Sequence, residues 1–401
     1  MILSHKIALD PTYQQEAYFR RACGAARFTY NWALAGWKRQ YEAGEKPSGL
    51  ALKKRFNAIR AVEFPWTYEV HRDCTARPFD QIQRAFAGFF RRVKAGQKPG
   101  YPRFKKKGQN RDSFYIANDK LALSDTAIRI PVIGWVRLRE ALRFTGKITG
   151  AVVSRRANRW FVAIQVDVGD VSRPRTSDAV VGVDLGIKAS ATLSTGEVLE
   201  GPRALRSSIE RLRRLSRSHS RKTKGSKNRS KSAMVLARHH AKVADLRNDF
   251  LHKTTTSLCR ENQAVVIEDL HVKGMLRNRR LARVIADEGW GELRRQLTYK
   301  ALMFGTEVIV APRFYPSSKT CSGCGNVKDT LLLSEREYLC DACGLQIDRD
   351  LNAALNLRSL GLATPEVTPV ERLALVSTSV ETKPASAKQE PNRAHLCAQV
   401  G

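Results

Sequence analysis

Four cysteines near the C-terminus constrain the fold of this chain most tightly. They follow the pattern C-x2-C, fifteen residues, C-x2-C, at Cys321, Cys324, Cys340 and Cys343. Four thiolates at this spacing can close a tetrahedral zinc shell, and a glycine after each pair lets backbone amides turn toward the sulfurs. Because such a shell leaves no open position for a substrate water, we predict one structural Zn²⁺ ion in a ribbon over residues 321–343.

The segments around the cysteines alternate in an order that carries three acidic residues. Residues 178–320 and 344–360 read as three strands, a helix, a strand, a helix, a strand, the cysteine insertion and a last helix. This order is the RNase H topology, in which the first and fourth strands are neighbours. Asp184 on the first strand and Glu268 on the fourth can therefore face each other, although they lie far apart in the sequence.

A third carboxylate opens the last helix, "RDLNAALNLRSLG". Asp348 and Asp350 are both candidates, and residues two apart project differently at a helix start, so we expect only one, Asp350, to bind a metal. Asp269 follows Glu268 and should point to the opposite face of its strand, in a structural role. Three crowded carboxylates repel one another unless cations lie between them, so we predict two catalytic Mg²⁺ ions held by Asp184, Glu268 and Asp350.

The N-terminal half combines one lone strand, two clear helices and a later group of strands. Residues 3–9 read as a strand, and Asp10 with Pro11 is typical of the start of a long amphipathic helix, with Gly24 as a candidate break. A second apolar stripe begins at Phe79, and short alternating strands fill residues 113–168. Since a lone strand is not stable, we predict a β-barrel over residues 1–10 and 110–170, interrupted by a helical domain over residues 11–109.

The charge of the chain indicates a polyanionic partner. Lys and Arg number 70 against 38 Asp and Glu, a formal net charge of +32, which favours nucleic acid. A basic turn mixes cations with aromatic rings, and a second run holds twelve Lys or Arg between Arg203 and Lys231, a density that disfavours a simple solvated helix. We predict nucleic-acid contacts at Tyr101, Arg103, Phe104, Lys105, Lys106, Arg211, Arg213, Arg214 and Arg217.

The ends of the chain and its apolar content indicate where it acts. No apolar run reaches the length of about 18 residues that a membrane helix needs, and "MILSHKIALD" lacks the blocks of a signal peptide. We therefore expect a cytoplasmic protein without membrane contact. Residues 361–401 contain prolines and small polar residues without helical or strand period beyond Ala363, and we expect them to be disordered.

Taken together, the motifs resemble one known family. "GVDLGIK", "VIEDLHVKGM", "YPSSKTCSGCG" and "CGLQIDRDLNAALN", with the N-terminal "RFTYNWAL" and "GYPRFKKKG", look like the transposon-encoded TnpB nucleases, relatives of the compact type V CRISPR effectors. The resemblance implies an α+β multidomain protein: a wedge-like β-barrel with an inserted helical recognition domain, then a RuvC nuclease domain with a zinc-ribbon insertion. It also implies RNA-guided cutting of double-stranded DNA beside a short flanking motif, with one guide RNA from the mobile element on a single chain.

Three other functions use similar residues. A type V CRISPR effector would have the same domains, and only the neighbouring DNA would separate it from a transposon protein. A transposase or junction resolvase would use the same carboxylates without RNA. A guided binder that blocks transcription would lack at least one of the three acids, which are all present.

Overall fold

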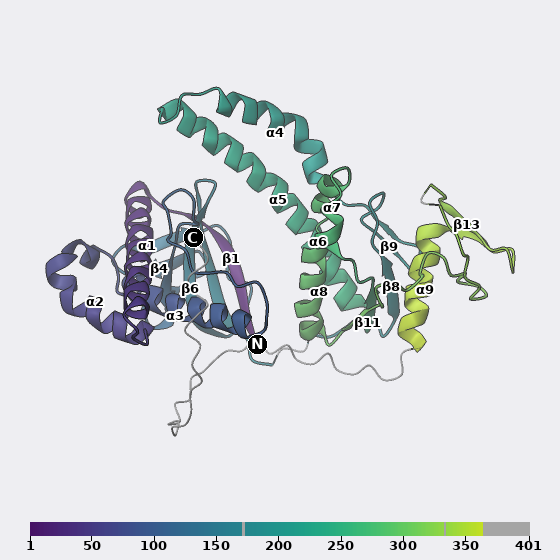
Figure 1. Cartoon of the computed structure of the whole chain (residues 1–401), viewed down its shortest axis with the longest axis horizontal. Coiled ribbons are helices and arrows are strands. Elements are labelled where there is room, and N and C mark those ends of the chain that lie inside the picture. Colours follow the sequence, from purple (N-terminus) through teal and green to yellow (C-terminus); the bar gives the residue numbers. More distant parts are fainter. Residues whose placement is uncertain (171–172, 333, 364–401) are drawn as a thin grey trace, which may run out of the picture. The chain divides into compact units, whose positions relative to one another are not determined.

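The N-terminal strand, β1 (Ile2–Asp10), finds its partners far along the chain. The computed structural model describes residues 1–170, 173–332 and 334–363 (Figure 1). In it, β1 pairs antiparallel with β7, from Ile2 opposite Asp167 to Ala8 opposite Phe161, and its last residues pair with β5. This confirms that the sheet begins at the N-terminus, is interrupted by helices and resumes near residue 113.

Seven strands form this first sheet in the order β2-β6-β7-β1-β5-β4-β3. Inward-facing residues alternate along β7 and pack with residues of the other strands and of α1 in one core. The pairings among the described residues leave β2 and β3 as free ends, so the sheet surrounds a core without closing into the predicted barrel. Besides β1, its strands are β2 (Ser113–Ala117), β3 (Ala122–Leu123), β4 (Ala127–Ile130), β5 (Gly134–Leu138), β6 (Lys147–Arg156) and β7 (Arg159–Asp167).

The helical insertion contains one more long helix than the sequence patterns predict. Its elements are α1 (Tyr13–Glu42), α2 (Gly49–Glu63), the 3-10 helix η1 (Pro65–Glu69) and α3 (Asp73–Lys94). Thr12 caps α1 through a capping box with Gln15, so the expected cap at Asp10 is wrong; Asp10 ends β1 instead. Gly24 does not break α1, which is continuous there.

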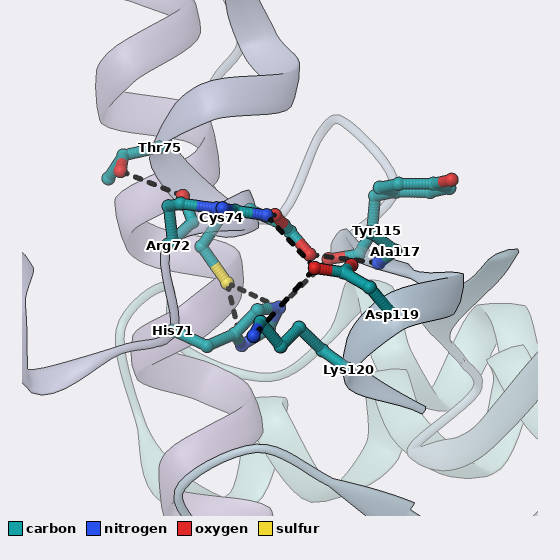
Figure 2. Close-up of polar contacts among 9 residues, drawn as sticks. His71, Arg72, Cys74, Thr75, Tyr115, Ala117, Asp119 and Lys120 are labelled. Carbon is teal, nitrogen blue, oxygen red and sulfur yellow. Dashed lines mark hydrogen bonds and ion pairs between the residues drawn. The ribbon is translucent and has the colours of Figure 1, made fainter. Parts of the chain in front are cut away.

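A buried polar network joins the start of α3 to β2 (Figure 2). His71 Nε2 lies 2.9 Å from the carbonyl oxygen of Tyr115, which can only accept, so this nitrogen carries the proton and Nδ1 accepts from the Tyr18 hydroxyl at 2.9 Å. The Ala117 amide donates to Asp73 at 2.8 Å. Cys74 is fully buried beside the imidazole. These bonds determine which nitrogen of the neutral imidazole carries the proton.

We expect acidification to weaken the fold through His71. Burial lowers the pKa of His71 below its usual value near 6.5, so the unfolded chain binds a proton more readily than the native chain does. The stability that the neutral His71 contributes is therefore fully present above about pH 6.5 and is lost as the pH falls below that value. The melting temperature of His71→Gln should depend less on pH between 8 and 5.5 than that of His240→Gln, which removes an exposed imidazole. Equal pH slopes for the two variants would contradict this assignment.

The second sheet has five strands in the order β10-β9-β8-β11-β12. The strands β8 (Val180–Asp184), β11 (Ala264–Ile267) and β12 (Glu307–Val310) are parallel, and β9 (Ala191–Leu193) and β10 (Val198–Leu199) form the predicted antiparallel meander beside β8. The prediction that the strands of Asp184 and Glu268 are neighbours is thus confirmed. Helices α6 (Val272–Met275), α7 (Ala282–Glu288), α8 (Trp290–Phe304) and α9 (Arg349–Ala363) accompany this sheet.

The basic run forms a helix, against the expectation from its charge. Figure 1 shows α4 (Ala204–Ser220) and α5 (Lys227–Glu261) as two long antiparallel helices. Leu212 and Ala204 of α4 are buried against Val243 of α5, and this apolar contact holds the helix despite its like charges. None of the helices within residues 1–170, 173–332 and 334–363 combines the length and the apolar content that a membrane-spanning helix needs.

Helix α9 continues to Ala363, into the range 361–401 that was expected to be disordered. The rest of that expected tail, residues 364–401, lies outside the described residues.

Candidate active site

Asp184 and Glu268 lie at the same edge of the second sheet. Asp184 is the last residue of β8, and Glu268 directly follows β11. The two strands are parallel and in register, with Val183 opposite Ile267, so the two acids are the next pair along. The carboxyl ends of parallel strands are where open sheets bind ligands.

A glycine lets α9 approach this edge closely. A Cβ at Gly182 would lie 2.0 Å from the carbonyl oxygen of Ala354 and 2.5 Å from the amide nitrogen of Arg358, so no other residue fits there. Gly182 stands two residues before Asp184, and the contact fixes the helix that begins with Arg349 and Asp350 against β8. The third acid is thereby brought to the other two.

The two remaining acids have structural contacts. Asp348 Oδ1 accepts from the backbone amides of Asp350 at 2.9 Å and Leu351 at 3.0 Å, so Asp348 caps α9. Asp269 forms ion pairs with Arg294 at 2.7 Å and with Arg313 at 2.6 Å. Asp350 lies close enough to act electrostatically on both Asp184 and Glu268, and Asp348 acts on Asp184 as well. The choice of Asp350 as the third metal-binding acid stays a prediction.

The pKa values of Asp184 and Glu268 are both raised. Burial is the largest cause of the raised pKa of Asp184, and the charges of Glu268 and Asp350 raise it further. Burial also raises the pKa of Glu268, against the hydrogen bond from Ser317, and Asp350 adds to the rise. A cation among these oxygens would offset the repulsion between the carboxylates. The donor set therefore fits hard divalent cations, which prefer carboxylate oxygen.

The four predicted cysteines meet in one cluster. Their sulfurs all lie within 4.8 Å of one another, and the pairs Cys321–Cys343 and Cys324–Cys340 are both 3.6 Å apart. Zn–S bonds of about 2.3 Å in a tetrahedron place the sulfurs about 3.8 Å apart, so the geometry suits zinc. Both following glycines, Gly325 and Gly344, have positive φ angles, of 77° and 74°. β13 (Glu337–Leu339) and β14 (Gln346–Asp348) form a hairpin that begins within residues 321–343 and ends beyond them.

The aromatic residues of the basic turn are partly packed within the protein. Tyr101 contacts the edges of Phe86 and Phe89, with ring centroids 5.6 and 5.3 Å away. The Lys38 ammonium lies 5.3 Å from the ring centroids of both Tyr101 and Phe104. Both rings remain about half exposed, so their contact with bases stays a prediction.

The basic residues of the same turn differ in their surroundings. Lys105 Nζ lies 3.8 Å from the centroid of Tyr30 and donates to Gln81 at 3.1 Å, and burial lowers the pKa of this lysine. Lys105 therefore has an intramolecular contact that the sequence pattern did not predict. Arg103 and Lys106 are exposed.

The four predicted arginines of α4 are all exposed. Arg213 forms an ion pair with Glu210 at 2.6 Å, a surface contact of small energy. Arg211, Arg214 and Arg217 are exposed residues of the same helix, on either side of the buried Leu212 in the sequence. Binding of a phosphate backbone by these arginines stays a prediction.

Three family models match the chain. Residues 163–279 match the IS605 OrfB model, described as "Probable transposase", and residues 290–357 match the "Cas12f1-like, TNB domain". Residues 1–46 match a model described as a helix-turn-helix domain, although these residues form β1 and the single long helix α1. The first two matches cover the elements that carry the three acids and the four cysteines.

Relatives with curated names match almost the whole chain. A protein of Streptomyces pristinaespiralis is 39% identical over 402 residues, which cover 97% of this chain and 96% of that protein. A protein of Escherichia coli K12 is 36% identical over 380 residues, 89% of this chain and 92% of that protein. Both are named "Putative RNA-guided DNA endonuclease", the second with the addition InsQ.

A more distant relative and a solved structure extend the comparison. A "TnpB-like protein" of Acanthamoeba polyphaga mimivirus is 33% identical over 143 residues, 34% of this chain and 27% of that protein. The fold is shared with Cas12f1 as solved in a complex with single guide RNA and target DNA, at a TM-score of 0.52 and 14% identity over 86% of this chain and 83% of that one. The chain belongs to the TnpB family.

Proposed function

We propose that the chain is an RNA-guided DNA endonuclease of a mobile element, which cuts double-stranded DNA beside a short flanking motif. The observation that carries this proposal is the meeting of Asp184, Glu268 and Asp350 at the carboxyl ends of β8 and β11. The names of the two relatives that match the chain over nearly their full length support it.

The proposed reaction is hydrolysis of a phosphodiester bond at the three acids. Asp184, Glu268 and Asp350 would hold two Mg²⁺ ions, which when bound activate water and stabilise the charge of the leaving oxygen. The chain itself places the acids: Gly182 lets α9 approach β8, Asp348 caps the helix of Asp350, and Ser317 holds Glu268.

We assign the domains on the same basis. Residues 1–10 and 110–170 form a wedge-like domain with the helical recognition domain 11–109 inserted, and residues 178–320 and 344–360 form a RuvC domain interrupted by the zinc ribbon 321–343. One Zn²⁺ ion at the four cysteines is the structural metal. The net charge of +32 suits a partner as large as a guide RNA with a DNA duplex. The related Cas12f1 was solved with both kinds of nucleic acid.

The exposed arginines of α4 give a prediction about nucleic-acid binding. Changing Arg211, Arg213, Arg214 and Arg217 to Ala should weaken binding to all sequences alike, because contacts with phosphate carry no sequence information. For duplex DNA, each lost phosphate contact reduces the magnitude of the slope of log K against log salt concentration by about 0.9. Loss of four contacts should therefore reduce the magnitude of the slope by about 3.6. Binding measured by fluorescence anisotropy at several salt concentrations checks this.

The matched control changes the same four arginines to Lys. This variant keeps the charges and should keep most of the salt dependence. If the Ala variant retains the affinity and the salt slope of the unchanged protein, the exposed face of α4 does not bind nucleic acid.

RNA that copurifies with the protein separates the proposal from its rivals. A transposase or resolvase with the same carboxylates needs no RNA, whereas a guided nuclease should carry one defined RNA species. Sequencing of that RNA should give a scaffold from the mobile element followed by a guide segment. A repeat-derived scaffold would instead favour a CRISPR effector, and absence of bound RNA would favour the RNA-independent enzymes.

A further inference from the structure

Hydrogen bonds and the backbone of residues 317–322 join Glu268 to the four-cysteine cluster. The segment Tyr315–Cys321 runs from the sheet into the ribbon, and its backbone is held by two side chains of α9. These two side chains are Asn352 and Asn356, one helical turn apart on one face of α9, and they are 0% and 4% exposed.

Asn352 holds the chain on both sides of Cys321. Its Nδ2 donates to the carbonyl oxygen of Thr320 at 2.7 Å, and its Oδ1 accepts from the amide of Ser322 at 2.9 Å. Both ends of this amide are therefore used to fix the first cysteine of the cluster against α9. A buried amide with both ends paired is a strong positional restraint, because any shift leaves a buried polar group unsatisfied.

Asn356 extends the same restraint to Ser317. Its Nδ2 donates both protons, one to the carbonyl oxygen of Ser317 at 2.7 Å and one to that of Thr320 at 2.6 Å. Ser317 is 3% exposed, and its hydroxyl donates to Glu268 Oε1 at 3.0 Å. The position of this carboxylate thus depends on a loop whose backbone is tied to α9 and to the cysteine cluster.

We propose that Ser317, Asn352 and Asn356 are positioning residues that couple the folding of the zinc ribbon to the placement of Glu268. The inference deepens the proposed nuclease function and rests on it. It also gives a reason for the ribbon to stand directly before α9: the metal cluster orders the segment that holds Glu268, and α9, which carries Asp350, supplies the anchor. Hydrogen bonds to metal-binding carboxylates orient them for the ion, and their loss typically lowers metal affinity or activity by 10- to 100-fold.

The first test is Ser317→Ala in the reconstituted protein and guide RNA complex. Mn²⁺ is used in place of Mg²⁺ because its binding can be measured by electron paramagnetic resonance without turnover. We expect Mn²⁺ affinity to fall by about 10-fold, and the Mg²⁺ concentration for half-maximal cleavage to rise by a similar factor, with zinc content unchanged. Ser317→Thr, which keeps the hydroxyl, should recover most of the affinity. Ser318→Ala is the matched control, because no hydrogen bond of the Ser318 hydroxyl is found among the described residues.

The second test concerns the two asparagines. Asn352→Ala and Asn356→Ala should release zinc to a coloured chelator at least several-fold faster and should also weaken Mn²⁺ binding. Ser359→Ala, an exposed change on the same helix, should do neither. Absence of guided cleavage by the unchanged protein would contradict the proposed function. If the unchanged protein cleaves and Ser317→Ala has unaltered Mn²⁺ affinity, only the present inference is overturned. Loss of zinc from Ser317→Ala would also overturn it, because Ser317 would then support the ribbon instead of placing Glu268.

Discussion

Asp184→Ala should abolish DNA cleavage while guided binding to the target survives. Asp184 ends β8 at the meeting point of the three acids, and its proposed role is to hold the ions that activate water. We expect the cleavage rate to fall by about 10⁴-fold or more, the order found when one member of a catalytic unit is removed. Binding depends on phosphate contacts and base pairing elsewhere, so the affinity for the matched target should change little. A gel assay of cleavage beside a binding titration measures both.

The same substitution should not destabilise the fold. The pKa of Asp184 is raised mainly by burial, so its ionised form costs free energy in the native state at neutral pH. Removal of the carboxylate should therefore leave the melting temperature in EDTA unchanged or higher. Glu268→Ala and Asp350→Ala should lose cleavage in the same way, and a double variant should lose little more than a single one, because the acids act as one unit.

Asp348→Asn is the matched control for these variants. It removes a carboxylate two residues from Asp350 but keeps an oxygen that can cap α9. Most of the cleavage activity should remain. If Asp348→Asn abolished cleavage and Asp350→Ala did not, Asp348 would be the third metal-binding acid.

Cys324→Ser should remove the zinc and unfold the ribbon. The four sulfurs lie within 4.8 Å of one another, and the binding free energy of a structural zinc ion is on the order of 10 kcal/mol and part of the folding of its loop. With three thiolates left, we expect zinc content to fall from one ion per chain toward zero, proteolysis within residues 321–343 to accelerate, and cleavage to be lost. Elemental analysis with limited proteolysis checks this.

Cys259→Ala is the control for the zinc variant. It removes a fully buried thiol outside the cluster and should keep the zinc. Absence of zinc from the unchanged protein would contradict the metal assignment. Retention of stoichiometric zinc by Cys324→Ser would show that the cluster does not bind as four thiolates.

The sequence predicted those features that depend on strand order and spacing. Parallel strands in register bring Asp184 and Glu268 together whatever their loops contain, so the order of elements was enough to place them on one edge. The cysteine cluster followed in the same way from its spacing. Both predictions rest on backbone geometry that many side chains can support.

The features that the sequence did not predict depend on side-chain partners far along the chain. Helix α2 was missed because Arg60 takes the place of an apolar residue in its stripe of Leu52 and Phe56, and this arginine is buried by its bonds to Thr67. The free ends of the first sheet reflect strand pairings that alternation alone does not determine. The helix of the basic run depends on a small apolar contact with α5.

The sequence patterns also did not predict the contacts of Asn352 and Asn356. Two asparagines spaced by four residues among alanines and leucines indicate a buried polar face, but their partners are backbone groups of a loop that no period identifies. Ser317 was one of two adjacent serines, and only the fold distinguishes it from Ser318. Hydrogen bonds that hold a site residue in place, such as the one from Ser317 to Glu268, are found only in the three-dimensional structure.

Exchange of the guide segment shows whether the RNA of the complex selects the DNA that the chain cuts. The protein is reconstituted with its copurifying RNA scaffold carrying one of two guide segments. Each of the two complexes is then incubated with two DNA targets, one matching each guide, and both targets carry the correct flanking motif. Each complex should cut both strands of its matched target alone in Mg²⁺, and neither target in EDTA. Cutting of both targets by either complex, or equal cutting without RNA, would contradict RNA-guided cutting by this chain.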